Sequence, residues 1–122
     1  MTTNKMRPIH PGEILRAELD EIRLSARALA AALRVPANRV TAVLNGRRGI
    51  TADTALRLAR FFGTSPEFWL NLQSAYDLRL AQRSDGVRIV REVQLLKEME
   101  ERADLTALRS FASKTRSALL SS

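Results

Sequence analysis

Eight arginines lie between Arg23 and Arg60 of this 122-residue chain, and Asp53 is the only acidic residue among them. This segment carries a net charge of +7, which equals the formal net charge of the whole chain. Guanidinium groups concentrated in this way attract polyanions and bind DNA phosphates with release of counterions. A solvated arginine-rich surface is the plainer alternative, and the helical pattern around these arginines disfavours it.

Residues 25–48 have the pattern of two short helices joined by a tight turn. Ser25 is a typical N-cap for a first helix over residues 26–33, because its hydroxyl can accept from a free backbone N–H. Pro36 disfavours helical geometry in the residue before it and is tolerated at a helix start, so it marks the turn and opens the second helix. Gly46 can adopt the left-handed conformation that ends this helix. The pattern predicts a helix-turn-helix, whose second helix enters the major groove of DNA.

The second helix has an inward face formed by Val40, Val43 and Leu44. The side chains left outside at its start occupy the positions from which a recognition helix contacts base edges. These candidate base-contacting residues are Ala37, Asn38, Arg39, Thr41 and Ala42. The candidate phosphate-contacting residues are Arg27, Asn45, Arg47 and Arg48.

We expect the elements that position these residues to form an all-α, five-helix helix-turn-helix domain, followed by a helical extension. We expect an N-terminal arm over residues 1–10, a DNA-binding domain over residues 11–83 and an amphipathic extension over residues 84–122. Helices are expected from Pro11 to Ile22, after Thr51 as far as Gly63, and from Ser65 to about Arg83. The first of these helices should bury Ile14, Leu15, Leu19 and Ile22 on one face. The fifth should carry an apolar band of Phe68, Trp69, Leu72, Tyr76 and Leu80.

Aromatic residues gather where the fourth helix ends and the fifth begins. The cluster of Phe61, Phe62, Phe68 and Trp69 is interleaved with leucines rather than with basic residues, which favours a core or a dimer surface over a base-stacking platform. Beyond the predicted break at residues 84–86, one apolar stripe is expected along a single helix. It comprises Ile89, Val93, Leu96, Met99 and Ala103. Asp104 is expected to cap a second helix carrying Leu105, Leu108, Phe111, Ala112 and Leu119. Folding back, dimerisation and partner binding could each bury these stripes.

An enzymatic site is not expected. The chain has no cysteine, and His10 is its only histidine, expected to pack or hydrogen-bond at the start of the first helix. The acidic residues Glu98, Glu100, Glu101 and Asp104 favour a solvated helix face over a metal site, although they could complement a basic protein. No cofactor and no metal are expected. No stretch is apolar enough for a signal peptide or a membrane span, so a cytoplasmic protein is expected.

Four motifs occur in order along residues 10–73: HPGEIL at 10–15, VTAVLNGRR at 40–48, ITADTALRL at 50–58 and SPEFWLNLQ at 65–73. Together they resemble the HigA/VapI antitoxin group of the XRE (phage-repressor-like) helix-turn-helix family, over roughly residues 7–83. Ala37 and Ala42 depart from the polar residues that related repressors often have there, which leaves thymine-methyl contacts to these positions. The segment after Arg83 is longer than in short members of the group.

The resemblance implies a homodimer that binds palindromic double-stranded operator DNA, represses its own operon and neutralises a small RelE/HigB-like toxin that cleaves mRNA. By position, it implies that Asn38, Arg39 and Thr41 face bases and that Arg47 and Arg48 face phosphate. Two alternatives stay open. One is a stand-alone XRE-family transcriptional regulator without a toxin partner, and the other is an interaction protein whose DNA binding is vestigial.

Overall fold

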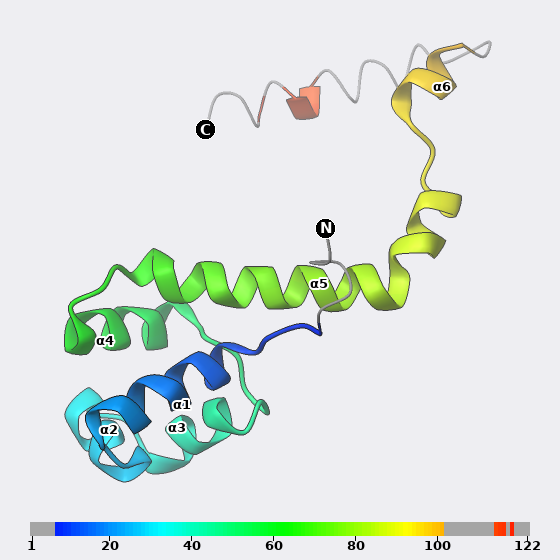
Figure 1. Ribbon diagram of the computed structural model, residues 1–122. Helices are drawn as coiled ribbons and strands as arrows, with labels where there is room; N and C mark the ends of the chain where they lie inside the picture. Colours follow the sequence, from blue (N-terminus) through cyan, green and yellow to red (C-terminus); the bar gives the residue numbers. More distant parts are fainter. Residues whose placement is uncertain (1–6, 102–113, 117, 119–122) are drawn as a thin grey trace. The chain divides into compact units, whose positions relative to one another are not determined.

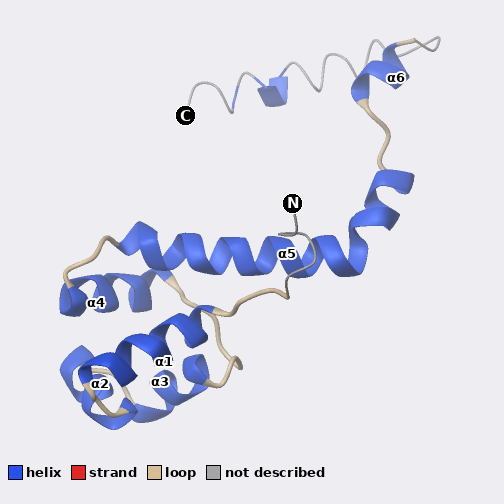
Figure 2. Cartoon of the chain, in the orientation of Figure 1, coloured by secondary structure: helices blue, strands red, loops and turns tan. Residues whose placement is uncertain are grey.

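The computed structural model describes residues 7–101, 114–116 and 118, and the secondary structure of this part is entirely helical (Figure 2). In chain order the helices are α1 (Pro11–Ile22), α2 (Ala26–Leu33), α3 (Ala37–Leu44), α4 (Ala52–Phe62), α5 (Pro66–Glu92) and α6 (Leu96–Glu100) (Figure 1). The all-α, five-helix prediction is confirmed. None of the helices in the described part is long and apolar enough to cross a membrane.

The chain divides into two compact units, Met1–Ser84 and Asp85–Ser122, and the division falls within α5. In the first unit α2 packs against both α3 and α4, and α1 packs against α3. This packing encloses one apolar core. Its largest fully buried side chains are Trp69, Leu15, Leu29, Leu58 and Val43. α3 is therefore held on a rigid base formed by the neighbouring helices.

The N-terminal turns of the helices are capped as the sequence predicts. The hydroxyl of Ser25 accepts from the backbone N–H of Ala28 at 3.1 Å, and that of Ser65 accepts from the N–H of Phe68 at 3.1 Å. The hydroxyl of Thr51 accepts from the N–H of Thr54 at 3.3 Å. Because such caps are local, the predicted bounds of the first four helices agree with the structure.

The aromatic cluster contributes mainly Trp69 to the core. Its side chain is buried, and its indole N–H donates to the hydroxyl of Thr64 at 2.9 Å, so no polar group is lost to burial. Phe62 is half-buried against it, with ring centroids 5.8 Å apart. Phe61 and Phe68 stay 39% and 41% exposed. The indole therefore belongs to the core, the first of the two predicted alternatives, and a dimer surface stays a prediction for the exposed rings.

The predicted end of the fifth helix near Arg83 is wrong, because α5 continues to Glu92. The hydroxyl of Ser84 donates to the carbonyl of Leu80 at 3.1 Å, so it bonds within the helix instead of ending it. The guanidinium of Arg88 then pairs with Asp85 at 3.0 Å and Glu92 at 3.1 Å, one turn away on either side. These pairs support the helix through the polar segment that was predicted as a break.

The apolar residues of the second unit do not form one continuous stripe. α5 ends at Glu92, and α6 begins only at Leu96, so the predicted single helix is interrupted. Ile89 and Val93 are exposed, whereas Leu96 and Met99 are half-buried. Ala103 and the predicted helix capped by Asp104, with Leu105, Leu108, Phe111, Ala112 and Leu119, lie outside the described residues.

Ile22 was predicted on the buried face of the first helix, and the structure contradicts this: it is 48% exposed. Arg23 takes the left-handed conformation, with φ 56°, and the backbone N–H of Leu24 bonds to the carbonyl of Leu19 at 2.9 Å. This reversal brings Leu24 against the core. Leu24 thus covers the end of α1 where the helical period alone would place Ile22.

The start of α1 is fixed by two reciprocal caps. The Nδ1 atom of His10 accepts from the backbone N–H of Gly12 at 2.8 Å, as expected of a histidine that hydrogen-bonds at a helix start. The carboxylate of Glu13 accepts from the backbone N–H of His10 at 3.2 Å and from the guanidinium of Arg7 at 2.7 Å. The Arg7 hydrogen bond is the main cause that lowers the pKa of Glu13 to about 2, and the His10 amide adds to it.

Replacing Glu13 with glutamine is expected to remove part of the acid sensitivity of folding. The carboxyl has a lower pKa in the folded state than in the unfolded state, so its stabilisation is complete above about pH 4.5 and is lost towards pH 2. The pair is solvent-exposed, which limits this stabilisation to at most about 1 kcal/mol. Urea unfolding of both proteins at a series of pH values should show a difference at neutral pH that vanishes near pH 2. A difference independent of pH would contradict the assignment.

Candidate DNA interface

The turn between α2 and α3 depends on two adjacent backbone features. Arg34 takes the left-handed conformation, with φ 62°, and its N–H bonds back to the last turn of α2. The N–H of Val35 donates to the carbonyl of Ala30 at 3.0 Å, and Pro36 is the N-cap of α3 in extended geometry. Pro36 thus opens α3 as predicted, one position before the helix. Left-handed geometry is rare for arginine, so no local sequence signal predicts it at this position.

α3 presents one buried face and one exposed face. Val40 and Val43 are 3% and 1% exposed and anchor the helix to the core. On the opposite side Ala37, Asn38 and Thr41 are exposed. The hydroxyl of Thr41 donates to backbone carbonyls of the preceding turn, which leaves its methyl group and lone pairs for an outside contact. The structure therefore gathers three of the five candidate base-contacting residues on one open surface.

The other two candidate base-contacting residues, Arg39 and Ala42, are half-buried. Arg39 lines a small hollow next to the core together with Leu15, Val40 and Leu58, among others. Its side chain is 26% exposed. Contact of these two residues with bases stays a prediction.

The loop after α3 holds two consecutive arginines in place. The backbone N–H groups of Arg47 and Arg48 both donate to the carbonyl of Ala42, at 2.9 and 3.2 Å. Gly46, with φ 74°, reverses the direction of the backbone after α3, so that these two N–H groups point back to the helix. Their side chains are exposed, as are those of the other candidate phosphate-contacting residues, Arg27 and Asn45. Two cations therefore follow the recognition helix at fixed backbone positions.

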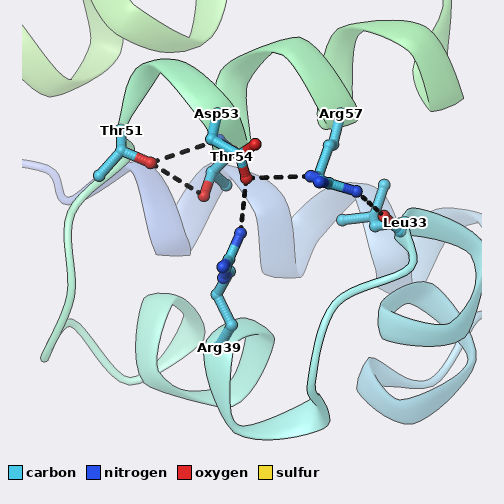
Figure 3. A network of polar contacts seen from close by, with 6 residues as sticks. All are labelled: Leu33, Arg39, Thr51, Asp53, Thr54 and Arg57. Atoms are coloured by element: carbon cyan, nitrogen blue, oxygen red, sulfur yellow. Dashed lines mark hydrogen bonds and ion pairs between the residues drawn. The ribbon is translucent and has the colours of Figure 1, made fainter.

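Asp53 connects α3 to α4 through the network in Figure 3. Its Oδ2 atom accepts from Nη1 of Arg39 at 2.6 Å and from Nε of Arg57 at 2.9 Å. Nη1 of Arg57 also donates to the carbonyl of Leu33, the last residue of α2, at 2.9 Å. The hydrogen bond from Arg57, followed by that from Arg39, lowers the pKa of Asp53. Asp53 is therefore a carboxylate at neutral pH, shared by two guanidinium groups.

Asp53 and Arg57 are not among the residues predicted from the sequence to contact DNA. A signal was present, because Asp53 is the only acidic residue between Arg23 and Arg60. An isolated carboxylate among eight arginines is strongly attracted to its neighbours. Its partner Arg39 lies 14 residues away, and pairing over that distance depends on tertiary structure, in which α2 packs against both α3 and α4.

Within the described residues, no group of three or more histidines and carboxylates is arranged to hold a metal ion. A shallow, open surface depression lies along α2 and α4 and is lined by Leu56, Arg57, Arg60 and Phe61, among others. The residues that line this depression do not bring a nucleophile and a base together. The exposed half of α3 and the exposed arginines that follow it are the candidate DNA interface of the first unit.

These features define the protein as a helix-turn-helix DNA-binding protein. A family model described as "Helix-turn-helix" matches residues 15–69. Virulence-associated protein I of Dichelobacter nodosus is 56% identical over 81 residues, which cover 66% of this chain and 75% of that protein. The chain belongs to the XRE helix-turn-helix family and, within it, to the group that contains the HigA and VapI antitoxins.

Solved structures agree with this assignment. An addiction module antidote protein of the HigA family from Coxiella burnetii is 63% identical with a TM-score of 0.73, and the match covers 74% of this chain and 99% of that one. Antitoxin HigA of Pseudomonas aeruginosa, solved with the higBA promoter, is 52% identical with a TM-score of 0.72 and the same coverage. The family is one of DNA-binding proteins rather than enzymes, in agreement with the sequence-based prediction.

Proposed function

We propose that this protein is the antitoxin of a type II toxin-antitoxin module, which binds operator DNA as a homodimer and represses its own operon. The observation that carries the DNA-binding part is the exposed first half of α3, followed at once by Arg47 and Arg48. The 52% identity to a HigA protein solved with its promoter supports the same surface. Neutralisation of a RelE/HigB-like toxin is the second part of the proposal.

Each exposed residue of α3 suits a particular contact. The amide of Asn38 can form two hydrogen bonds with adenine, whereas the methyl groups of Ala37 and Thr41 fit the thymine methyl group. Arg47 and Arg48 suit phosphate, because their charge attracts any sequence equally. One short helix reads too few base pairs for useful specificity, and a homodimer on a palindrome doubles the number.

Replacing Asn38 with alanine is expected to weaken operator binding by about 1 to 3 kcal/mol and to relax the preference at one position of each half-site. The side chain is exposed and anchors nothing in the core, so the fold should be unaffected. Fluorescence anisotropy with the DNA upstream of the reading frame, and with single-base variants of it, measures both effects. Asn71→Ala removes the same group from the exposed surface of α5 and is the matched control. Equal losses in the two variants would argue against α3 as the recognition helix.

The toxin half of the proposal is tested in cells. Expression of the small reading frame adjacent to this gene should arrest growth, and co-expression of this protein should relieve the arrest and yield a complex on purification. Relief without a complex would contradict direct neutralisation. Absence of both toxicity and a complex, with operator binding retained, would support the stand-alone regulator instead. Operator binding that is weak and independent of sequence would support the vestigial alternative.

A further inference from the structure

We infer that Asp53 is a positioning residue that sets how well the protein discriminates its operator from other DNA, by fixing the guanidinium of Arg39. The inference rests on the proposed DNA-binding function. Arg39 lies in the first turn of α3, and Asp53 lies in the first turn of α4. Their side chains point toward each other and meet at 2.6 Å (Figure 3).

The geometry of the contact leaves Arg39 able to bind a second group. A guanidinium carries five N–H donors in a rigid fork, and Asp53 engages Nη1. A carboxylate bound there restricts the orientation of the guanidinium and so directs its remaining donors. Two parallel donors of a fixed fork match O6 and N7 of guanine, which is the commonest specific contact of arginine with a base. An unrestrained arginine would contact the nearest phosphate equally well.

Asp53 is itself held by a second arginine. Nε of Arg57 donates to the same carboxylate oxygen as Arg39, and Nη1 of Arg57 donates to the carbonyl that ends α2. The chain of contacts therefore runs from the helix-turn-helix turn, through Arg57 and Asp53, to the recognition helix. The position of the carboxylate is set by three helices rather than by one flexible side chain.

The charge of Asp53 has a further effect on DNA of any sequence. Its side chain is 54% exposed within the most basic segment of the chain, so it repels phosphates that approach there. The ion pair with Asp53 also keeps Arg39 from contacting phosphate. Both effects weaken sequence-independent binding, while the fixed fork strengthens operator binding. Asp53 should thus affect the two kinds of binding in opposite directions, which a residue with only a structural role would not do.

The test compares the full-length protein with Asp53→Asn, Arg39→Ala and the double variant. The probes are a duplex of roughly 30 base pairs, selected from random sequence by the unaltered protein, and a scrambled duplex of the same composition. Asp53→Asn should bind the scrambled duplex more tightly. The slope of its log affinity against log salt concentration should be steeper by about 0.9 per protomer, the value for one added phosphate contact. Its ratio of selected to scrambled affinity should fall roughly tenfold. In the Arg39→Ala background, Asp53→Asn should leave this ratio unchanged.

Asp53→Glu keeps the charge and should recover part of the discrimination, and thermal unfolding of each variant establishes that it is folded. A ratio for Asp53→Asn within twofold of the unaltered protein would overturn the inference while leaving the proposed function intact. An equal fall of the ratio in the Arg39→Ala background would also overturn it, since the effect would not pass through Arg39. If the unaltered protein selected no sequence, the proposed DNA-binding function would fail, and this inference with it.

Discussion

Replacing Gly12 with alanine is expected to lower the free energy of unfolding by about 3 kcal/mol. A Cβ atom at this position would lie 2.9 Å from the carbonyl carbon of Val43 and closer still to its oxygen. The obstacle is backbone, so no side chain can rotate away, and α1 would have to separate from α3. Urea unfolding measures the change, with fluorescence of the single, buried Trp69 as the signal.

Gly63→Ala is the matched control for this prediction. Gly63 has φ 74°, and a Cβ atom there would meet nothing within 4 Å. Its substitution therefore costs only the left-handed strain of a non-glycine residue, about 1 kcal/mol. The two variants separate steric collision from backbone strain. Equal destabilisation would show that the α1–α3 contact yields easily, contrary to the close packing of the core.

Local signals explain why so much of this fold follows from the sequence. The hydroxyls of Ser25 and Thr51 accept from backbone N–H groups three residues later, and Gly63 reverses the backbone at the end of α4. These helix ends therefore need no tertiary information. The phase of α3 was predictable for a similar reason. Once Val40 and Val43 are assigned to the core, the helical period places Asn38 and Thr41 outside.

The features that sequence analysis missed depend on competition between signals or on distant contacts. The polar run after Arg83 resembles a break, yet the two ion pairs of Arg88 carry α5 through it. Arg23 and Arg34 reverse the chain in left-handed geometry that glycine usually adopts, so neither helix end had its usual signal. The pairing of Arg39 with Asp53 requires tertiary structure that brings the starts of α3 and α4 together, with α2 packed against both helices. A candidate site predicted from the pattern of α3 alone therefore includes Arg39 but cannot include Asp53, which lies in α4.

Replacing both Arg47 and Arg48 with alanine is expected to weaken binding to every DNA sequence and to flatten its dependence on salt. Each phosphate contact that is lost reduces the slope of log affinity against log salt concentration by about 0.9. Two arginines in each protomer of a dimer therefore reduce the slope by about 3 to 4. The affinity deficit of the variant should shrink by roughly 100-fold between about 50 and 200 mM salt.

A control with two arginines of α5 replaced distinguishes direct contact of Arg47 and Arg48 with phosphate from long-range attraction by their charge. Arg83→Ala combined with Arg91→Ala removes the same two charges from exposed positions of α5. If Arg47 and Arg48 bind phosphate directly, the α5 variant keeps the slope of the unaltered protein, because no counterion-releasing contact has been lost. If they act only through net charge, both double variants lose affinity alike. Since the backbone N–H groups of Arg47 and Arg48 bond to the last turn of α3, direct contact would also fix the recognition helix relative to the phosphates.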